Sequence, residues 1–203
     1  LQTILADLGH TVASRLRLEG SLGQQVDLRS AFRLQPDPMP MGDTLPMTLG
    51  NLQREGEIRL LLEVVVHPIG QISRLTLAHF TVAGDVLARE VPSDPLPVRA
   101  EIDVSDKPDP NPPPQEIATA LSQLALISLQ EKARHEAELG QATQAARRLE
   151  NLATQLLASD ERELARAALN EAERLTYSRR LSNEGEKILK YGTRSLLLPA
   201  RVS

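Results

Sequence analysis

Cysteine and tryptophan are absent from this 203-residue chain, and only Phe32, Phe80, Tyr177 and Tyr191 are aromatic. Without cysteine the chain can form no disulfide, no thiolate metal site and no cysteine nucleophile. So few aromatic rings leave little surface on which sugars or single-stranded nucleic acids could stack. The core must therefore be built from Leu, Val, Ile and Ala.

Long apolar runs are also missing. The longest, residues 60–66, is interrupted by Glu63 and is too short to cross a bilayer. The first ten residues lack the basic start of a signal peptide. We therefore expect no membrane span and a cytoplasmic location, with export or surface association through additional sequence as the alternative. Because the chain starts at Leu1 rather than Met, we expect it to be a fragment of a longer protein.

The net charge of the chain does not indicate a class of binding partner. The formal net charge is -4, and neither half of the chain has the strong basic excess of a nucleic-acid-binding protein. The expected partners are therefore proteins of unknown identity and not nucleic acid.

Proline divides the chain into two regions. Thirteen of the fourteen prolines precede residue 115, and five of them lie between residues 107 and 114. Such a run favours extended backbone and cannot enter a helix interior. We interpret 107–114 as a semi-rigid linker that joins a β-sandwich, residues 1–106, to a helical domain, residues 115–203. Residues 1–10 would be the remaining helix end of a preceding domain.

Alternation of apolar and polar residues predicts strands in the first region. In the clearest of these segments Ile58, Leu60, Leu62, Val64 and Val66 share one face. Short turns without intervening helices favour an antiparallel sandwich. The predicted strands are 12–18, 25–34, 57–67, 71–82 and 96–104.

A helical period begins after Pro114. Apolar residues three and four apart predict helices over 115–139, 141–157 and from 160 onward, with a shorter helix over 183–190. Asp160 with Glu163 is typical of a capping box, and Gly192 is expected to end the last helix. The fold class is thus α+β, a sandwich followed by a helical bundle or hairpin.

No arrangement of residues indicates catalysis. The histidines, residues 10, 67, 79 and 135, lack zinc-site spacing, and no nucleophile elbow or phosphate-binding loop occurs. Residues 103–107 partly match the metal-binding loop of von Willebrand A domains, but Lys107 replaces the final Ser of that motif. We expect no enzyme activity, no catalytic residue, no metal and no cofactor.

Two arginine pairs are the strongest candidates for an interaction surface. Arg147 with Arg148 and Arg179 with Arg180 could form a basic patch, although neighbouring glutamates favour an ordinary charged surface. Residues 139–157 resemble a tetratricopeptide helix pair, but no second repeat is clear. The alternative function is therefore peptide binding in a groove between helices 115–139 and 141–157.

The order of these features resembles the region that follows the A domain in a group of bacterial von Willebrand factor type A proteins. The residues that carry the resemblance are 8–18, 31–36, 41–46, 57–63 and 185–194. The resemblance implies an accessory or scaffold module that supports protein–protein contact, with an A domain N-terminal to Leu1. The metal site of that family belongs to the A domain, so no metal ligand is assigned to this chain.

Overall fold

The computed structural model describes residues 11–68, 70, 72–87, 95–107 and 111–197. The chain divides into two compact units, residues 1–112 and 113–203. The first contains two antiparallel sheets and the second contains four helices, so the predicted α+β class is confirmed. The expected helix end at residues 1–10 and the middle of the linker, residues 108–110, lie outside the described residues.

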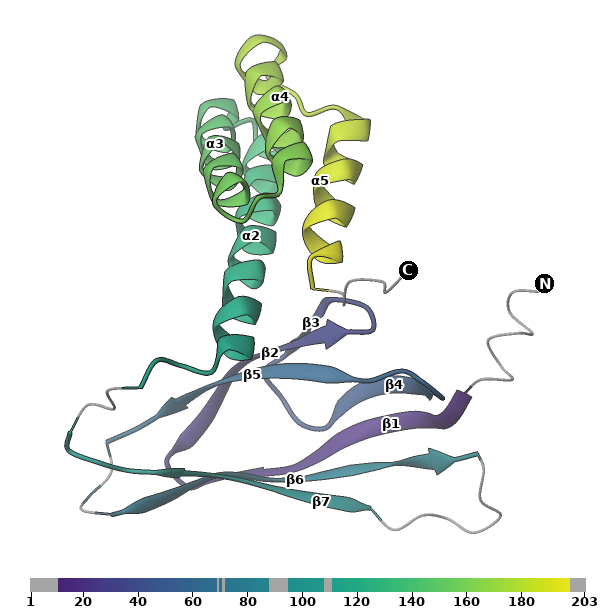
Figure 1. Ribbon diagram of the computed structural model, residues 1–203, viewed down its shortest axis with the longest axis vertical. Helices are drawn as coiled ribbons and strands as arrows, with labels where there is room; N and C mark the ends of the chain where they lie inside the picture. The colour runs from purple at the N-terminus through teal and green to yellow at the C-terminus, as the bar shows by residue number, and fades with distance from the viewer. Residues whose placement is uncertain (1–10, 69, 71, 88–94, 108–110, 198–203) are drawn as a thin grey trace. The chain divides into compact units, whose positions relative to one another are not determined.

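Seven strands form the first unit (Figure 1). The four-stranded sheet has the order β4-β1-β6-β7, and the three-stranded sheet has the order β3-β2-β5. The strands are β1 (Thr11–Leu22), β2 (Val26–Gln35), β3 (Met39–Gly42), β4 (Met47–Gln53), β5 (Arg59–Val66), β6 (Arg74–Val86) and β7 (Leu96–Asp103). Each of the five predicted strands has a counterpart among them.

Strands β3 and β4 were not among the predicted strands, which left residues 35–56 without a strand. Tertiary contacts explain the difference, because the Arg33 side chain on β2 connects all three strands. Its Nε donates to the Asp37 carbonyl at 3.0 Å, and its Nη1 donates to the Leu49 carbonyl on β4 at 3.0 Å. Its Nη2 lies 3.0 Å from the sulfur of Met39 on β3. No local pattern in the sequence predicts these contacts.

The sandwich core is aliphatic apart from Phe80. Its buried members come from both sheets, and the predicted apolar face of β5 packs against them through Ile58, Leu60 and Leu62. Val66, at the end of that face, is 38% exposed. The buried core residues are Leu18, Ala31, Met47, Leu49, Ala78 and Phe80.

The second unit contains α2 (Gln115–Glu138), α3 (Ala142–Ala158), α4 (Arg162–Ser178) and α5 (Asn183–Ser195). Helix α3 packs against α2 and α4, and α5 contacts α2 and α4 (Figure 1). Small residues such as Ala145, Ala153 and Ala168 are at most 1% exposed, which lets the helices approach closely. Leu149, Leu152, Leu156 and Leu175 fill the space between them.

Two predicted helix boundaries are wrong. Glu161, not Asp160, is the N-cap of α4, and no side chain caps that helix. Asp160 has a positive φ of 61° and its carboxylate instead accepts from Arg162 Nε at 2.8 Å. Gly192 does not end α5, which continues to Ser195. A Cβ at Gly192 would lie 2.1 Å from Cδ2 of Leu164, so this glycine permits close packing of α5 on α4.

Candidate functional site

A turn between α2 and α3 borders a groove in the helical unit. Gly140 has a φ of +76°, a left-handed conformation that glycine adopts without steric penalty. The chain can therefore reverse within three residues and start α3 at Ala142. Helix α3 then runs beside α4, with its apolar stripe buried as predicted.

The cavity is a groove of about 500 Å³ between the first turns of α3 and the last turns of α4. Amide, hydroxyl and guanidinium groups dominate its lining, and small apolar side chains complete it. The lining residues are Gly140, Gln141, Ala142, Thr143, Gln144, Ala146, Arg147, Glu150, Leu175, Thr176 and Arg179.

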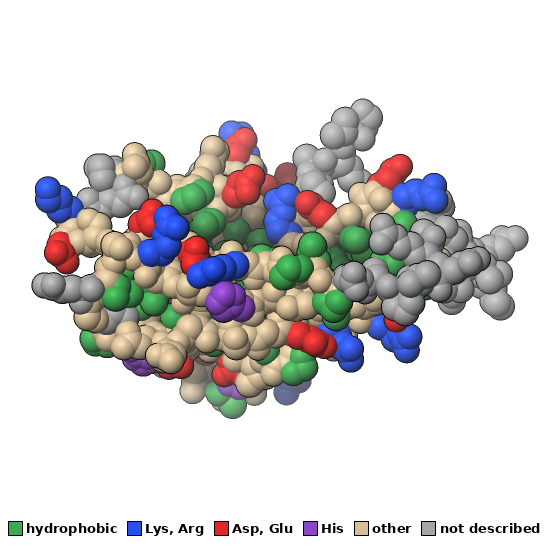
Figure 2. All heavy atoms as spheres, turned by 90° about the horizontal axis from the view of Figure 1, so that it is seen from below, with side chains coloured by type: hydrophobic (Ala, Val, Ile, Leu, Met, Phe, Trp, Pro, Cys, Tyr) green, Lys and Arg blue, Asp and Glu red, His purple; other side chains and the backbone are tan. Residues whose placement is uncertain are grey.

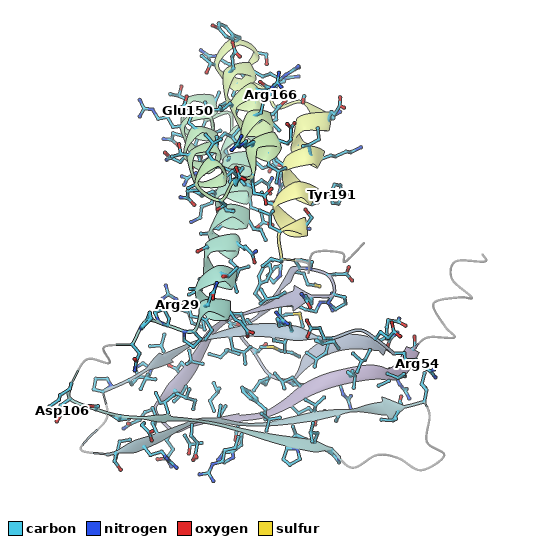
Figure 3. The ribbon with its side chains drawn as sticks, viewed as in Figure 1. Arg29, Arg54, Asp106, Glu150, Arg166 and Tyr191 are labelled. Carbon is cyan, nitrogen blue, oxygen red and sulfur yellow. The ribbon has the colours of Figure 1, made fainter. Side chains whose placement is uncertain are left out.

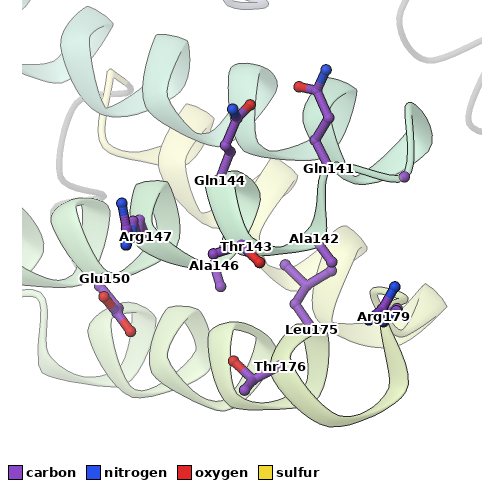
Figure 4. Close-up of a pocket in the computed structure, with 11 residues that line it drawn as sticks. Gln141, Ala142, Thr143, Gln144, Ala146, Arg147, Glu150, Leu175, Thr176 and Arg179 are labelled. Atoms are coloured by element: carbon purple, nitrogen blue, oxygen red, sulfur yellow. The ribbon is translucent and has the colours of Figure 1, made fainter.

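Figure 4 shows how these side chains are distributed along the groove. Arg147 and Glu150 lie toward one end, and Arg179 lies at the other, with Leu175 and Ala142 between them. Arg179 is the C-cap of α4 and has left-handed backbone angles, with φ 56° and ψ 20°. The two arginines are thus supplied by different helices and are 32 positions apart in the sequence.

Two of the four arginines proposed as an interaction surface line the groove, Arg147 and Arg179. Arg148 points elsewhere and pairs with Glu136 on α2. Arg180 is not among the lining residues, and its backbone carbonyl accepts from the Ser178 hydroxyl at 3.2 Å. Helical geometry separates Arg147 from Arg148, because consecutive positions differ by about 100° around a helix axis.

Arg148, unlike the arginines of the groove, forms an ion pair with Glu136. Both guanidinium nitrogens Nε and Nη2 donate to the Glu136 carboxylate, which is 15% exposed. The hydrogen bonds from Arg148 lower the pKa of Glu136 and outweigh the effect of its burial. The same hydrogen bonds raise the pKa of Arg148. The charge of Arg148 is therefore neutralised by Glu136, and the ion pair links α3 to α2.

Most of the described arginines form an ion pair with a carboxylate, but Arg147 and Arg179 in the groove do not. Within the described ranges, no ion pair is formed by Arg54, Arg147, Arg166, Arg179 or Arg180. The groove thus brings together two unpaired guanidinium groups, beside the single carboxylate of Glu150. Helix α3 also begins without an acidic residue in its first turn.

Sequence reasoning missed the uncharged part of the groove. Gln141, Gln144, Thr143 and Thr176 have no periodic or motif signal, because polar residues at exposed helix positions are common. Only the packing of α3 against α4 brings Thr176 near the first turn of α3. The predicted peptide groove between 115–139 and 141–157 also differs, since the cavity lies on the α4 side of α3.

The histidines are dispersed in the structure. His67 Nε2 lies 2.5 Å from Asp27 Oδ2, and His135 Nδ1 lies 3.9 Å from Glu138. His79 lies opposite Arg99 in the register of β6 and β7. His10 lies outside the described residues. Among the residues that the structure does describe, no three His, Asp or Glu side chains are grouped to hold a metal ion.

Surface charge on the face shown in Figure 2 is mixed. Acidic and basic side chains alternate there, and apolar side chains form separate small patches. None of the described helices has the length and apolar character needed to cross a membrane.

Comparisons with known proteins give two matches. Residues 115–199 match the family model described as the Sll0103-like C-terminal alpha-helical domain. The fold resembles the structure described as von Willebrand factor type A from Catenulispora acidiphila, with a TM-score of 0.59 and 10% identity. That similarity covers 95% of this chain and 48% of the other, so the chain spans about half the length of that protein. No curated protein matches the chain.

The structural match confirms the resemblance to von Willebrand factor type A proteins at the level of fold alone. The family model gives the helical unit a likeness of its own, and neither match tests the expected place after an A domain. At 10% identity the likeness carries no site residue from one protein to the other.

Proposed function

We propose that this chain is a non-enzymatic accessory module of a larger von Willebrand factor type A protein, in which it supports contact between proteins. The observation that carries the proposal is the likeness in fold to half of such a protein over nearly the whole chain. In this arrangement an A domain precedes Leu1.

An exposed apolar row on β7 supports the proposal. Leu96, Val98 and Ile102 are 64%, 44% and 42% exposed, although they lie opposite Val82, Phe80 and Leu75 of the sandwich. Directly opposed residues of an antiparallel pair share a face of the sheet. The apolar face of the four-stranded sheet therefore continues beyond its cover on an edge strand, where another protein surface could bury it.

The complete reading frame and crosslinking of the whole protein test this proposal. We expect the frame to encode an A domain upstream of Leu1, and crosslinks to join that domain to residues of 11–107. A frame without an A domain, or an A domain that gives no crosslink to this chain, contradicts the proposal.

The groove between α3 and α4 favours a second candidate, a helical peptide-binding module. Its support is a cavity that combines unpaired guanidinium groups, amides and an apolar floor. This candidate is compatible with the first, because one chain can both accompany an A domain and hold a peptide.

A further inference from the structure

We propose that the groove between α3 and α4 binds an acidic peptide segment of a protein partner. The inference rests on the proposed role in protein contact and specifies where and by which chemistry the contact is made. Its foundation is the charge and shape of the described groove.

Charge complementarity determines the class of ligand. Arg147 and Arg179 line the same cavity, and neither forms an ion pair with any residue in the described ranges. Guanidinium groups bind carboxylates through paired hydrogen bonds. Glu150 offsets one of these charges and lies toward the Arg147 end (Figure 4). A ligand with at least one carboxylate near Arg179 therefore fits the groove best.

Packing of the helices does not explain the presence of Arg147 and Arg179. Each is exposed, so neither contributes to the core. Arg147 lies in the second turn of α3 and forms no ion pair with a described residue, so its charge is available to a carboxylate of a ligand.

The middle of the groove suits an extended backbone with small side chains. Ala142 is only partly buried and supplies apolar contact, and Gln141, Gln144 and Thr176 supply donors and acceptors for peptide groups. A cavity of about 500 Å³ accommodates a few residues of a peptide and not a folded surface. Acidic residues alternating with small apolar residues match this lining.

Fluorescence anisotropy with the whole chain tests the proposal. The probe is a fluorescein-labelled peptide, Gly-Glu-Ala-Glu-Ala-Glu-Gly, and its matched control replaces each Glu by Gln. We expect binding of the acidic peptide with a Kd below about 1 mM, at least about tenfold tighter than the Gln peptide. The acidic peptide should bind more weakly when salt rises from about 0.05 M to about 0.5 M.

Single substitutions locate the binding. Arg147→Gln and Arg179→Gln should each weaken binding of the acidic peptide by about three- to tenfold. Glu150→Gln should strengthen it, because one repelling carboxylate is removed. Arg166→Gln is the matched control: Arg166 is an unpaired arginine of α4 outside the groove, labelled in Figure 3. All four positions are exposed, so the melting temperature should stay unchanged.

Three results would overturn the proposal: equal binding of the Glu and Gln peptides, no binding near 1 mM, or equal losses in Arg166→Gln and the groove variants. Tighter binding of a short RNA oligonucleotide than of the acidic peptide would assign a different ligand and also overturn it. Crosslinks between an A domain and residues 11–107 do not depend on this groove. Failure of the peptide experiment can therefore be distinguished from failure of the accessory-module proposal.

Discussion

Glu171 is a buried carboxylate whose neighbours connect α4 to α5. Its Oε2 accepts from the Ser182 backbone N–H at 2.7 Å, and its Oε1 accepts from the Ser182 hydroxyl at 2.6 Å. The Ser182 oxygen in turn accepts from Gly185 N at 2.9 Å, which caps the first turn of α5. This network satisfies a carboxylate that is only 7% exposed.

Gly185→Ala should destabilise the helical unit by about 2 kcal/mol. A Cβ at this position would lie 2.3 Å from Cδ and Oε1 of Glu171, which its two hydrogen bonds to Ser182 hold in place. This clash outweighs the gain that alanine usually brings to a helix. Urea denaturation followed by circular dichroism measures the change. Gly70→Ala is the control, because no described atom outside its own chain neighbours lies within 4 Å of its added Cβ. Equal stability of Gly185→Ala and the unaltered chain would contradict the prediction.

The Glu136–Arg148 pair predicts a pH dependence. Because its pKa in the folded state is lowered, Glu136 stabilises the helical unit fully above its ordinary pKa of 4.5. This contribution is lost as the pH falls through the folded-state pKa. Glu136→Gln should therefore lower the melting temperature near about pH 7, and the difference should shrink toward about pH 3. Glu150→Gln, which removes a carboxylate without an ion pair in the described structure, is the control. A difference that does not change with pH would contradict this origin.

At the scale of elements, the two edge strands of the four-stranded sheet have different environments. Met47 and Leu49 on β4 are at most 4% exposed, whereas β7 has no buried residue. The partner sheet has one strand fewer and covers the apolar side of the larger sheet only in part. Phe80 and Val98 are directly opposed on β6 and β7, yet they are 8% and 44% exposed.

This contrast predicts different effects of one substitution at two adjacent sites. Val98→Asp should cost about 1 kcal/mol or less, since the new carboxylate reaches water and only strand propensity is lost. Phe80→Asp should prevent the sandwich from folding, because it buries an unpaired charge and removes the aromatic side chain from the core. Circular dichroism and thermal melting measure both. A large loss for Val98→Asp would mean that β7 is covered in solution, and size-exclusion chromatography would show whether a second copy covers it.

At the scale of the whole molecule, each unit has a hydrophobic cluster of its own. Leu152 belongs to the cluster of the helical unit and is 0% exposed, and all members of that cluster lie between residues 126 and 196. The sandwich cluster lies between residues 16 and 82. Separate cores of this kind are the physical basis of independent domains.

We therefore expect residues 113–203 to fold when expressed alone. The isolated helical unit should show the circular dichroism of a helical protein and a cooperative melt. Leu152→Ala should lower its stability by about 3 kcal/mol, because the packed helices cannot close the cavity. The exposed Leu157 is the control: Leu157→Ala should cost much less. A non-cooperative melt of residues 113–203 would contradict independent folding.

Tyr191 illustrates which features of a helix a sequence pattern can predict. The sequence predicts the last helix only over residues 183–190, yet Tyr191 lies on α5, and its 65% exposure (Figure 3) depends on which face of α5 meets α4. The apolar stripe of α3 was predictable in full, since a strong 3.6-residue period leaves one face to bury. In α2 the period is weaker, and Leu121 is 54% exposed although it is one of the apolar residues, spaced three and four apart, that predict this helix.

Local physical chemistry determined much of this protein from sequence alone. Proline density separates extended from helical segments, and apolar period distinguishes strands from helices, because both act within a few residues. Tertiary structure alone decided the place of β4 beside β1, the close approach at Gly192, and the position of Arg147 and Arg179 at opposite ends of one groove. Each of these depends on contacts between residues distant in sequence, where side-chain packing and not local conformational preference selects the arrangement.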